Sequence, residues 1–250
     1  MRTSQKRVSI IIPFYNHWKL VSDRLLELNR FIPLGHEVVL VNDASEEDVT
    51  QQVAFWQSKA NYDVSYYINP ENLGFGKSMN VGAKVALQHK ADVLVFLSND
   101  VEVGKDFVNQ LIAIFTSDNK LLVGAELMDW DTGWNKIQGT IIPYLNGWFL
   151  SCTAESWKEL GGFDDRYAPF DYEDVDLSLT ALTLGYELVQ LYDSLIPQRM
   201  GEQTPLRHMG GRTAMYNEER GDITRRNRQR FIEKWQPRMK EINVTVANVR

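Results

Sequence analysis

The sequence predicts an α/β fold with a mainly parallel sheet flanked by helices. Over the first hundred of its 250 residues, short apolar runs rich in β-branched residues alternate with segments of helical apolar spacing. The short runs are apolar at nearly every position, which is typical of strands buried on both faces of a parallel sheet. Polar clusters follow three of these runs, and open α/β sheets bind ligands at the carboxyl ends of their strands.

Four strands and two helices are predicted in this region from the apolar periodicity. The strands cover residues 8–13, 37–41, 64–68 and 93–97, and the helices cover residues 18–31 and 77–88. Ser45, with Asp48 three residues further on, is predicted to cap the helix that follows the second strand. The polar clusters at the strand ends are Tyr15-Asn16, Asn42-Asp43 and Ser98-Asn99-Asp100.

The second half of the chain does not keep this alternation. Glycines and prolines interrupt residues 128–150, and helices are predicted near 154–160 and 174–184. Residues 222–235 form a basic amphipathic segment, for which a solvated helix face and a contact with anionic lipid or nucleic-acid phosphate are both open. No repeat or linker is visible, so we expect one domain over residues 1–250 with two functional halves.

Composition and charge narrow the class of protein. A hydrophobic content of 44% is enough for a full core, and a net charge of −6 disfavours a dedicated nucleic-acid binder. Cys152 is the single cysteine, so we expect a reducing, cytoplasmic setting and a buried apolar role for its thiol. No apolar run approaches the length of a membrane span, so any lipid acceptor would be reached peripherally, from the membrane surface.

Three polar features are candidates for chemistry, and each has a structural alternative. Asp100 ends an apolar strand, where it either faces a cleft or caps a helix. Residues 171–176 carry four carboxylates, which either exploit a helix dipole or include a general base near a metal. His208 lies in a polar, glycine-bordered loop, where a metal or phosphate contact and a structural role are both open.

The order of these pieces resembles that of the inverting, GT-A-fold enzymes of glycosyltransferase family two, over residues 8 to about 235. Residues 8–16 are similar to the family's opening strand and Pro-x-Tyr-Asn turn, 41–45 to its base-binding aspartate segment, and 72–82 to its Asn-x-Gly…Asn-x-Gly helix start. Residues 96–100 stand in the place of its Asp-x-Asp metal motif, 161–164 and 172–178 match its acceptor-side block, and 208–211 match its late metal-binding histidine. A GT-A fold with a mixed, mainly parallel sheet is therefore implied.

The resemblance also implies roles for individual residues. The nucleotide-sugar site is expected at Pro13, Phe14, Tyr15, Asn16, Asp43, Asn72, Lys77, Asn80, Ser98 and Asn99. Asp43 is expected to read the nucleoside base, and uridine is the commonest base in the resembling family. Asp100 and His208 are expected to hold Mn²⁺ or Mg²⁺ against the diphosphate.

Asp174 is expected to be the catalytic base, with Glu173 beside it, and Trp148 and Asp176 are expected to bind the acceptor. Residues 8–100 would then bind the donor, residues 101–235 would bind the acceptor, and residues 236–250 would form a tail.

Three departures from the family pattern bear on these roles. Ser98 replaces the first acid of the metal motif, so the metal site has one carboxylate fewer. Met79 stands where the family often has arginine, and Lys77 is the alternative source of that charge. Thr153 replaces a basic residue that is common two positions after the acceptor-side strand.

The expected function is transfer of a sugar from a nucleoside diphosphate, UDP above all, to a hydroxyl of a saccharide, lipid-linked or polymer acceptor. Trp130, Trp134 and Trp148 either form a sugar-stacking wall or pack in the core. A non-catalytic nucleotide-sugar-binding protein is one alternative, suggested by Ser98, and a transferase acting on modified nucleic-acid bases is another. A nucleotidyltransferase is disfavoured, because Phe14-Tyr15-Asn16-His17 replaces the glycine-rich phosphate loop that it needs.

Overall fold

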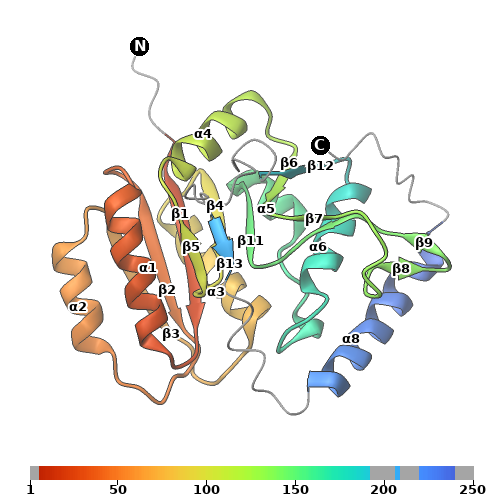
Figure 1. The fold of residues 1–250 in the computed structure, drawn as a ribbon, viewed down its shortest axis with the longest axis horizontal. Helices are drawn as coiled ribbons and strands as arrows, with labels where there is room; N and C mark the ends of the chain where they lie inside the picture. The colour runs from red at the N-terminus through yellow and green to blue at the C-terminus, as the bar shows by residue number, and fades with distance from the viewer. Residues whose placement is uncertain (1–5, 192–205, 209–219, 240–250) are drawn as a thin grey trace.

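A seven-stranded sheet forms the centre of the protein, with helices on both of its faces (Figure 1). The computed structural model describes residues 6–191 and 220–239, together with the backbone of residues 206–208. The strand order is β12-β6-β11-β4-β1-β2-β3. The strands are β1 (Val8–Phe14), β2 (Glu37–Asn42), β3 (Asp63–Ile68), β4 (Val93–Leu97), β6 (Leu121–Gly124), β11 (Phe149–Thr153) and β12 (Glu187–Gln190).

The sheet is mixed and mainly parallel, as predicted. Strand β11 runs antiparallel to both of its neighbours, β4 and β6, and the remaining pairs are parallel. Strands from the first hundred residues and from the second half therefore belong to the same sheet. The four strands predicted in the first half are all present, and β1 continues to Phe14.

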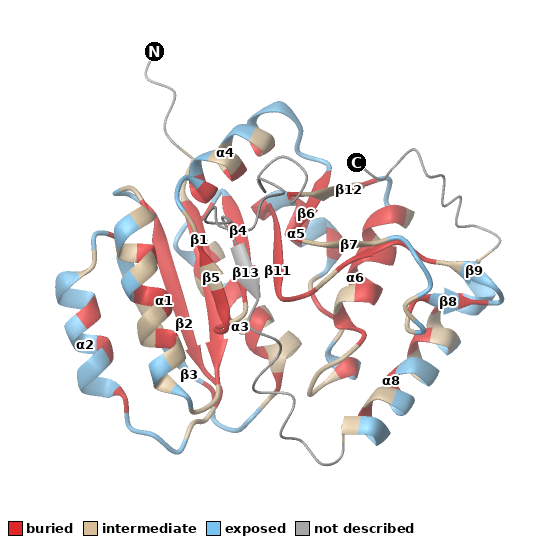
Figure 2. Ribbon diagram, in the orientation of Figure 1, coloured by how far each residue is buried: buried red, intermediate tan, exposed pale blue. Residues whose placement is uncertain are grey.

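Each face of the sheet is covered by its own group of helices. Strand residues alternate between the two faces: Ile10 and Ile12 pack in one core cluster and Ile11 in the other. The first cluster is covered by α1 (Trp18–Phe31), α2 (Thr50–Lys59) and α4 (Phe107–Ser117). The second cluster is covered by α3 (Phe75–Gln88), α5 (Ala154–Leu160) and α6 (Glu173–Thr183). Strands β1, β2 and β4 are buried along their whole length between these layers, which explains their largely apolar sequences, whereas the edge strand β3 is exposed at its ends (Figure 2).

Short strand pairs complete the second half of the chain. They are β5 (Val101–Val103) with β13 (Leu206–His208), β7 (Leu127–Met128) with β10 (Tyr144–Leu145), and β8 (Lys136–Ile137) with β9 (Thr140–Ile141). The predicted basic segment is helix α8 (Arg220–Trp235), which is followed by the short helix η3 (Gln236–Arg238). Ile137, Phe231 and Trp235 share a third core cluster, so the β8–β9 hairpin packs beside α8.

The predicted cap at Ser45 is wrong. Helix α2 begins at Thr50 with Val49 at the N-cap position, and the side chain of Val49 offers no oxygen to the helix. The Ser45 hydroxyl instead accepts a hydrogen bond from the backbone N–H of Asn16, at 2.7 Å. A contact between the ends of β1 and β2 therefore decides the role of this serine, because the two strands are parallel neighbours.

Two glycines allow close approaches that position α3. A Cβ on Gly82 would lie 2.3 Å from Cγ2 of Ile11, so only glycine lets the helix pack this closely on β1. Gly74 has φ +85°, and a Cβ there would lie 2.4 Å from the backbone of Pro169. The backbone N–H of Phe75 donates to the Pro169 carbonyl at 2.7 Å, which joins the start of α3 to the loop before α6.

Helix α8 holds the loop that leads into α6. Asn227 is fully buried, and its side-chain amide donates to the backbone carbonyls of Tyr167, Phe170 and Asp171, at 2.6, 2.8 and 3.0 Å. Asp171 and Tyr172 have φ values of 74° and 80°, a left-handed conformation that is strained for residues other than glycine. The contacts from α8 hold this strained segment in place.

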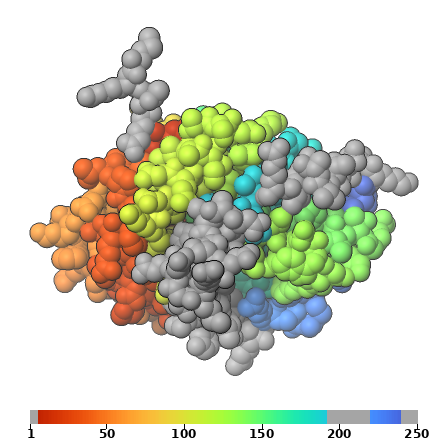
Figure 3. Space-filling view, turned by 45° about the horizontal axis from the view of Figure 1, so that its top comes forward, coloured from red at the N-terminus to blue at the C-terminus, as the bar shows by residue number. Residues whose placement is uncertain are grey.

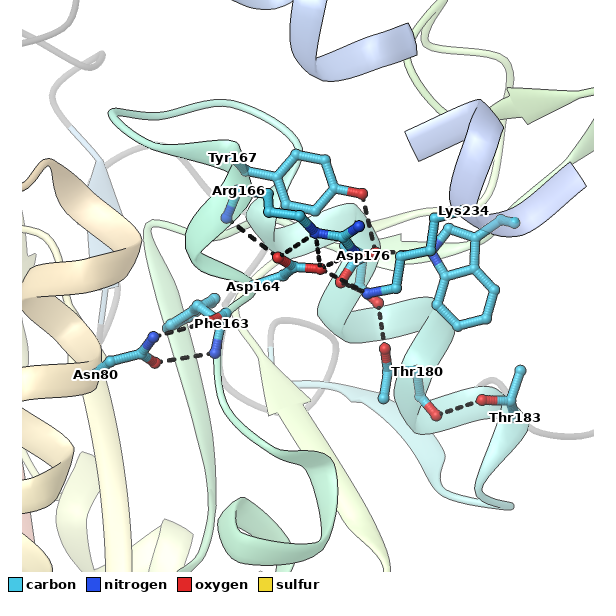
Figure 4. A network of polar contacts seen from close by, with 10 residues as sticks. Asn80, Phe163, Asp164, Arg166, Tyr167, Asp176, Thr180, Thr183 and Lys234 are labelled. Atoms are coloured by element: carbon cyan, nitrogen blue, oxygen red, sulfur yellow. Dashed lines mark hydrogen bonds and ion pairs between the residues drawn. The ribbon is translucent and has the colours of Figure 1, made fainter. Parts of the chain in front are cut away.

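A second set of contacts joins the other end of α8 to the same region (Figure 4). The Lys234 ammonium lies 2.9 Å from a carboxylate oxygen of Asp164 and 2.7 Å from one of Asp176. The hydroxyl of Tyr167 donates to the other Asp176 oxygen, as does the indole N–H of Trp235. Helix α8 is therefore not merely a solvated face, because its buried and charged side chains make tertiary contacts.

Replacing Asn227 with alanine is expected to destabilise the protein by about 2 to 3 kcal/mol, because buried carbonyls would lose their donor. Equilibrium urea unfolding measures the change in the free energy of unfolding. Asn109 is the matched control, since it is an exposed helical asparagine, and its alanine variant should change stability by less than about 0.5 kcal/mol. Equal stability of the two variants would show that Asn227 does not hold the loop.

Candidate active site

A single cleft of about 1060 Å³ gathers most of the predicted site residues. It opens at the carboxyl ends of β1, β2 and β4, where the polar clusters were predicted. Twelve residues of the predicted sites line it: Pro13, Phe14, Tyr15, Asn16, Asp43, Asn72, Ser98, Asn99, Asp100, Trp148, Glu173 and Asp174. The strand ends of the first half and the start of α6 therefore face the same cavity.

Asp43 has a structural contact that the sequence did not predict. One of its carboxylate oxygens accepts from the Asn69 side chain and the backbone N–H of Leu73, at 2.7 and 2.8 Å. The other oxygen accepts from the backbone N–H of Gly74, at 2.9 Å. Asp43 is buried while lining the cleft, so it fixes the 69–74 loop against the end of β2 and shapes the wall at that point.

The turn after β1 is held in an unusual conformation. Asn16 and His17 have φ values of 54° and 55°, and both residues line the cleft. The Asn16 backbone donates to Ser45, and its side-chain oxygen accepts from the backbone N–H of Glu46 at 2.9 Å. Because asparagine tolerates the left-handed region better than most residues, this turn explains the need for Asn16 in the motif.

Asp100 lies at the end of β4 with its carboxylate oriented by Ser98. The Ser98 hydroxyl donates to one Asp100 oxygen at 2.6 Å. Ser98, which stands where the family motif has its first aspartate, therefore orients the second acid of the motif, Asp100. In the β5–β13 pair, the backbone of His208 lies opposite Val101, the residue after Asp100. The predicted metal ligands are thus adjacent in the backbone, while the side chain of His208 lies outside the described residues.

Asp174 is anchored at the start of α6 by two backbone groups. Its Oδ2 accepts from the N–H of Gly147 at 2.8 Å, and its Oδ1 accepts from the N–H of Val175 at 2.8 Å. Gly147 is close because it lacks a side chain: a Cβ there would lie 3.0 Å from the Cβ of Asp174. A carboxylate oxygen has two acceptor sites, so each oxygen can still take a proton or hydrogen bond from a ligand.

Burial raises the pKa of both adjacent carboxyl groups, Glu173 and Asp174. Burial raises the pKa of Asp174 to about 6, against the hydrogen bonds from Gly147 and Val175 that favour the charged form. Burial also raises the pKa of Glu173 well above its ordinary value, and the neighbouring Asp174 charge raises it further. Glu173 Oε2 is buried without a hydrogen-bond partner. At neutral pH Asp174 is therefore ionised, while burial and the Asp174 charge favour the neutral form of Glu173.

Three residues of the predicted sites do not line this cleft. Asn80 donates from its side chain to the Phe163 carbonyl and to Asp165, and it accepts from the N–H of Phe163, so it ties α3 to the loop after α5 (Figure 4). Asp176 is buried with both carboxylate oxygens bonded, as described above, and it supports α8 instead of facing an acceptor. Lys77 is half-buried on α3.

Several cleft residues were not predicted. Residues from the second half that also line it include Thr132, Tyr144, Asn146, Gly147, Phe170, Asp171 and Arg220. The Asn146-Gly147 dipeptide before Trp148 is a turn signal that could have indicated a close approach. Arg220 has no such signal, because it reaches the cleft only through the packing of α8.

The three candidate tryptophans all line the cleft, but their exposure differs. Trp148 is buried, Trp134 is half-buried against Tyr172 with ring centroids 5.6 Å apart, and 51% of Trp130 is exposed. Trp148 donates from its indole N–H to Glu126, at 3.4 Å. Core packing therefore explains the position of Trp148, most of whose surface is buried, but it does not explain the position of Trp130.

Comparison with known families finds one match that covers most of the chain. A family profile described as "Glycosyl transferase family 2" matches residues 9–175. Polypeptide N-acetylgalactosaminyltransferase 8 of Drosophila melanogaster is 28% identical over 217 residues, which cover 74% of this chain and 36% of that protein. An uncharacterized glycosyltransferase of Haemophilus influenzae is 33% identical over 93 residues, covering 37% of this chain and 29% of that protein. The matches thus span about a third of the length of these curated relatives.

Solved structures show the same fold at low sequence identity. GalNAc-T7, in a structure with UDP, GalNAc and Mn²⁺, has a TM-score of 0.62 at 17% identity, covering 74% of this chain and 42% of that chain. The mannosyltransferase PcManGT from Pyrobaculum calidifontis, in complex with GDP-Man and Mn²⁺, has a TM-score of 0.60 at 20% identity, covering 79% and 59%. These similarities establish the GT-A fold.

None of the helices in the described ranges is long and apolar enough to cross a membrane. In the same ranges, no three His, Cys, Asp or Glu side chains are grouped closely enough to hold a metal ion.

Proposed function

The chain belongs to glycosyl transferase family 2 and is a glycosyltransferase, and from this we propose that it moves a sugar from a nucleoside diphosphate to an acceptor hydroxyl with inversion. One observation carries the proposal: a single cleft contains both the predicted donor residues at the strand ends and a backbone-anchored Asp174. A transferase needs this arrangement, because donor and acceptor must meet in one cavity with a proton acceptor beside them.

Asp174 is the proposed general base. The acceptor oxygen attacks the anomeric carbon of the donor sugar and forms the new C–O bond, while the bond to the diphosphate oxygen breaks. The nucleoside diphosphate leaves with the electron pair, and the acceptor proton passes to Asp174. Attack opposite the leaving group inverts the anomeric centre. A pKa of about 6 suits this role, because Asp174 is ionised at neutral pH and still a stronger base than an ordinary aspartate.

The donor side of the cleft is proposed to bind a nucleoside diphosphate, with UDP as the first candidate. Pro13, Tyr15 and Asn16 line it at the end of β1, and Asp43 shapes the wall at the end of β2. The structure of GalNAc-T7 contains UDP, whereas that of PcManGT contains GDP-Man, so neighbours of this fold differ in their base. Binding measurements are therefore needed to identify the nucleoside base of the donor.

A divalent metal fits the residues around Asp100. A carboxylate, with an imidazole from His208, is a donor set suited to Mn²⁺ or Mg²⁺. The described residues do not form a cluster of three ligands, and a diphosphate would complete the coordination, as it does in many nucleotide enzymes. When bound there, the ion would act as a Lewis acid that stabilises charge on the leaving diphosphate. The Ser98 hydroxyl orients the Asp100 carboxylate for this contact.

A thermal-shift panel of nucleoside diphosphates, each with and without Mn²⁺, tests the donor assignment. One diphosphate is expected to raise Tm by several degrees in the presence of metal, since a ligand at about 100 times its Kd adds about 2.7 kcal/mol of stability. No stabilisation by any diphosphate would contradict a nucleotide-sugar site. Stabilisation with metal, but no turnover on any acceptor, would favour the non-catalytic alternative.

The cellular location, the division into halves and the role of Trp148 stay predictions. A cytoplasmic location rests on the single cysteine, which is buried with its thiol pKa raised by burial. The division into a donor half over residues 8–100, an acceptor half over residues 101–235 and a tail follows the family resemblance. The role of Trp148 in acceptor binding is supported by its place in the cleft wall.

A further inference from the structure

Trp130 is exposed in a way that packing does not explain. The large side chains of this protein are mostly buried, yet 51% of Trp130 is accessible, and the residue lines the active-site cleft. An indole at the wall of a cleft presents an apolar face and a polar N–H, and aromatic side chains of this kind commonly line ligand-binding clefts. In Figure 3 the green part of the chain that holds this residue lies at the surface, next to the blue helix α8.

The loop that carries Trp130 is rigidly built. Asn135 is fully buried, and its side-chain amide donates to the carbonyls of Trp130 and Ile142, at 3.0 and 2.8 Å. Its side-chain oxygen accepts from the backbone and the hydroxyl of Thr132, at 3.1 and 2.9 Å. A rigid frame lowers the entropy lost when a ligand binds, so the exposed ring is pre-organised for contact.

The loop is also tied to the catalytic base by a short path. Strand β7 ends two residues before Trp130, and its Met128 pairs with Tyr144 of β10. Gly147, three residues after Tyr144, donates the hydrogen bond that anchors Asp174. The backbone at Trp130 is therefore joined, through β7 and β10, to the segment that anchors the proposed proton acceptor.

The charges around the ring disfavour some classes of ligand. Asp129 and Asp131 flank Trp130 and are both exposed, and hydrogen bonding with Lys136 lowers the pKa of Asp131, so its carboxylate stays charged. Lys136 lies 2.7 Å from Asp131 and offsets its charge, so the net charge beside the ring is that of Asp129, which disfavours a phosphate polymer. These charged groups also hydrate a surface that a lipid chain would need dry. The carboxylates are, in contrast, good acceptors for sugar hydroxyl groups, while an indole face suits the apolar face of a sugar ring.

We propose that Trp130 is a stacking platform for a neutral saccharide unit of the acceptor. This assignment rests on the proposed transferase function and names its acceptor class. The indole face would contact the C–H face of the sugar ring, and the flanking carboxylates would accept hydrogen bonds from its hydroxyls. The platform positions the acceptor and takes no part in proton transfer.

The test combines a neutral glycan array with titration of the best-binding neutral oligosaccharide, using the full chain with Mn²⁺ and the stabilising nucleoside diphosphate. Wild-type protein is expected to bind neutral glycans, and Trp130→Ala is expected to weaken the titrated interaction about tenfold. Trp130→Phe should retain most of the affinity, because it keeps an aromatic face. Phe55→Ala is the matched control, since Phe55 is 55% exposed on α2, and it should bind as wild type does.

Two outcomes would overturn the platform. One is wild-type binding confined to poly(glycerol phosphate) or anionic vesicles, and the other is unchanged glycan affinity in Trp130→Ala. The nucleotide thermal shift separates this failure from failure of the transferase proposal. If the thermal shift persists in Trp130→Ala while glycan affinity is unchanged, the donor site is supported and the role of Trp130 in acceptor binding is contradicted. If wild-type protein shows no shift with any nucleotide, the transferase proposal itself fails.

Discussion

Replacing Asp174 with asparagine is expected to slow sugar transfer by about 10²- to 10⁴-fold, while the metal-dependent thermal shift with nucleoside diphosphate stays close to that of wild type. The amide cannot accept the acceptor proton, although it occupies nearly the same volume. Its oxygen can keep one of the two backbone hydrogen bonds, from Gly147 or Val175, so the local structure should persist. Steady-state kinetics on acceptor and donor, with thermal melting as the check on folding, measure the change.

The pH profile distinguishes a base from a merely structural carboxylate. Because burial raises the pKa of Asp174 to about 6, wild-type kcat/KM should fall about tenfold per unit as the pH drops below this value and the base becomes protonated. The residual activity of Asp174→Asn should lack this limb. Asp23→Asn, which alters a carboxylate on α1 outside the cleft, should leave both rate and profile unchanged. Equal losses of donor binding and turnover in Asp174→Asn would make Asp174 structural.

Replacing Asp100 with asparagine is expected to weaken the metal-dependent binding of nucleoside diphosphate by at least about 100-fold, more than loss of a typical outer-shell partner. The neutral amide is a poorer ligand for a hard cation than the carboxylate at the end of β4. Titration of Mn²⁺ in the thermal-shift assay, with EDTA-treated protein as the zero point, measures the change.

Ser98→Ala provides a graded comparison for the metal site. It removes the hydroxyl that donates to Asp100 at 2.6 Å but leaves the carboxylate, so a loss of about tenfold in metal affinity is expected. Thr116→Ala, which removes a helix-surface hydroxyl on α4, should have no effect on the titration. An Asp100→Asn variant that responds to Mn²⁺ as wild type does would place the metal elsewhere.

The strands and helices of the first half follow from the sequence alone. Apolar periodicity is set by neighbouring residues, and a strand buried on both faces is apolar at nearly every position. The ordered motifs likewise predicted the fold class, and most of the predicted site residues line the cleft, because parallel strands bring their carboxyl ends to one edge. The same local reasoning assigned Ser45 wrongly. Its hydroxyl accepts a hydrogen bond from the distant backbone N–H of Asn16 and does not cap the helix.

Partners far apart in the chain were decided only by tertiary packing. The anchoring of Asp174 by Gly147, the clamp of Asn227 on the 167–171 segment and the burial of Asp176 under Lys234 join positions that no local pattern relates. For the same reason Asn80 matches a binding motif by its spacing, yet its side chain bonds to Phe163 and Asp165. Residue type and spacing determine which chemistry is available, and the meeting of distant segments determines which side chains are left facing the cleft.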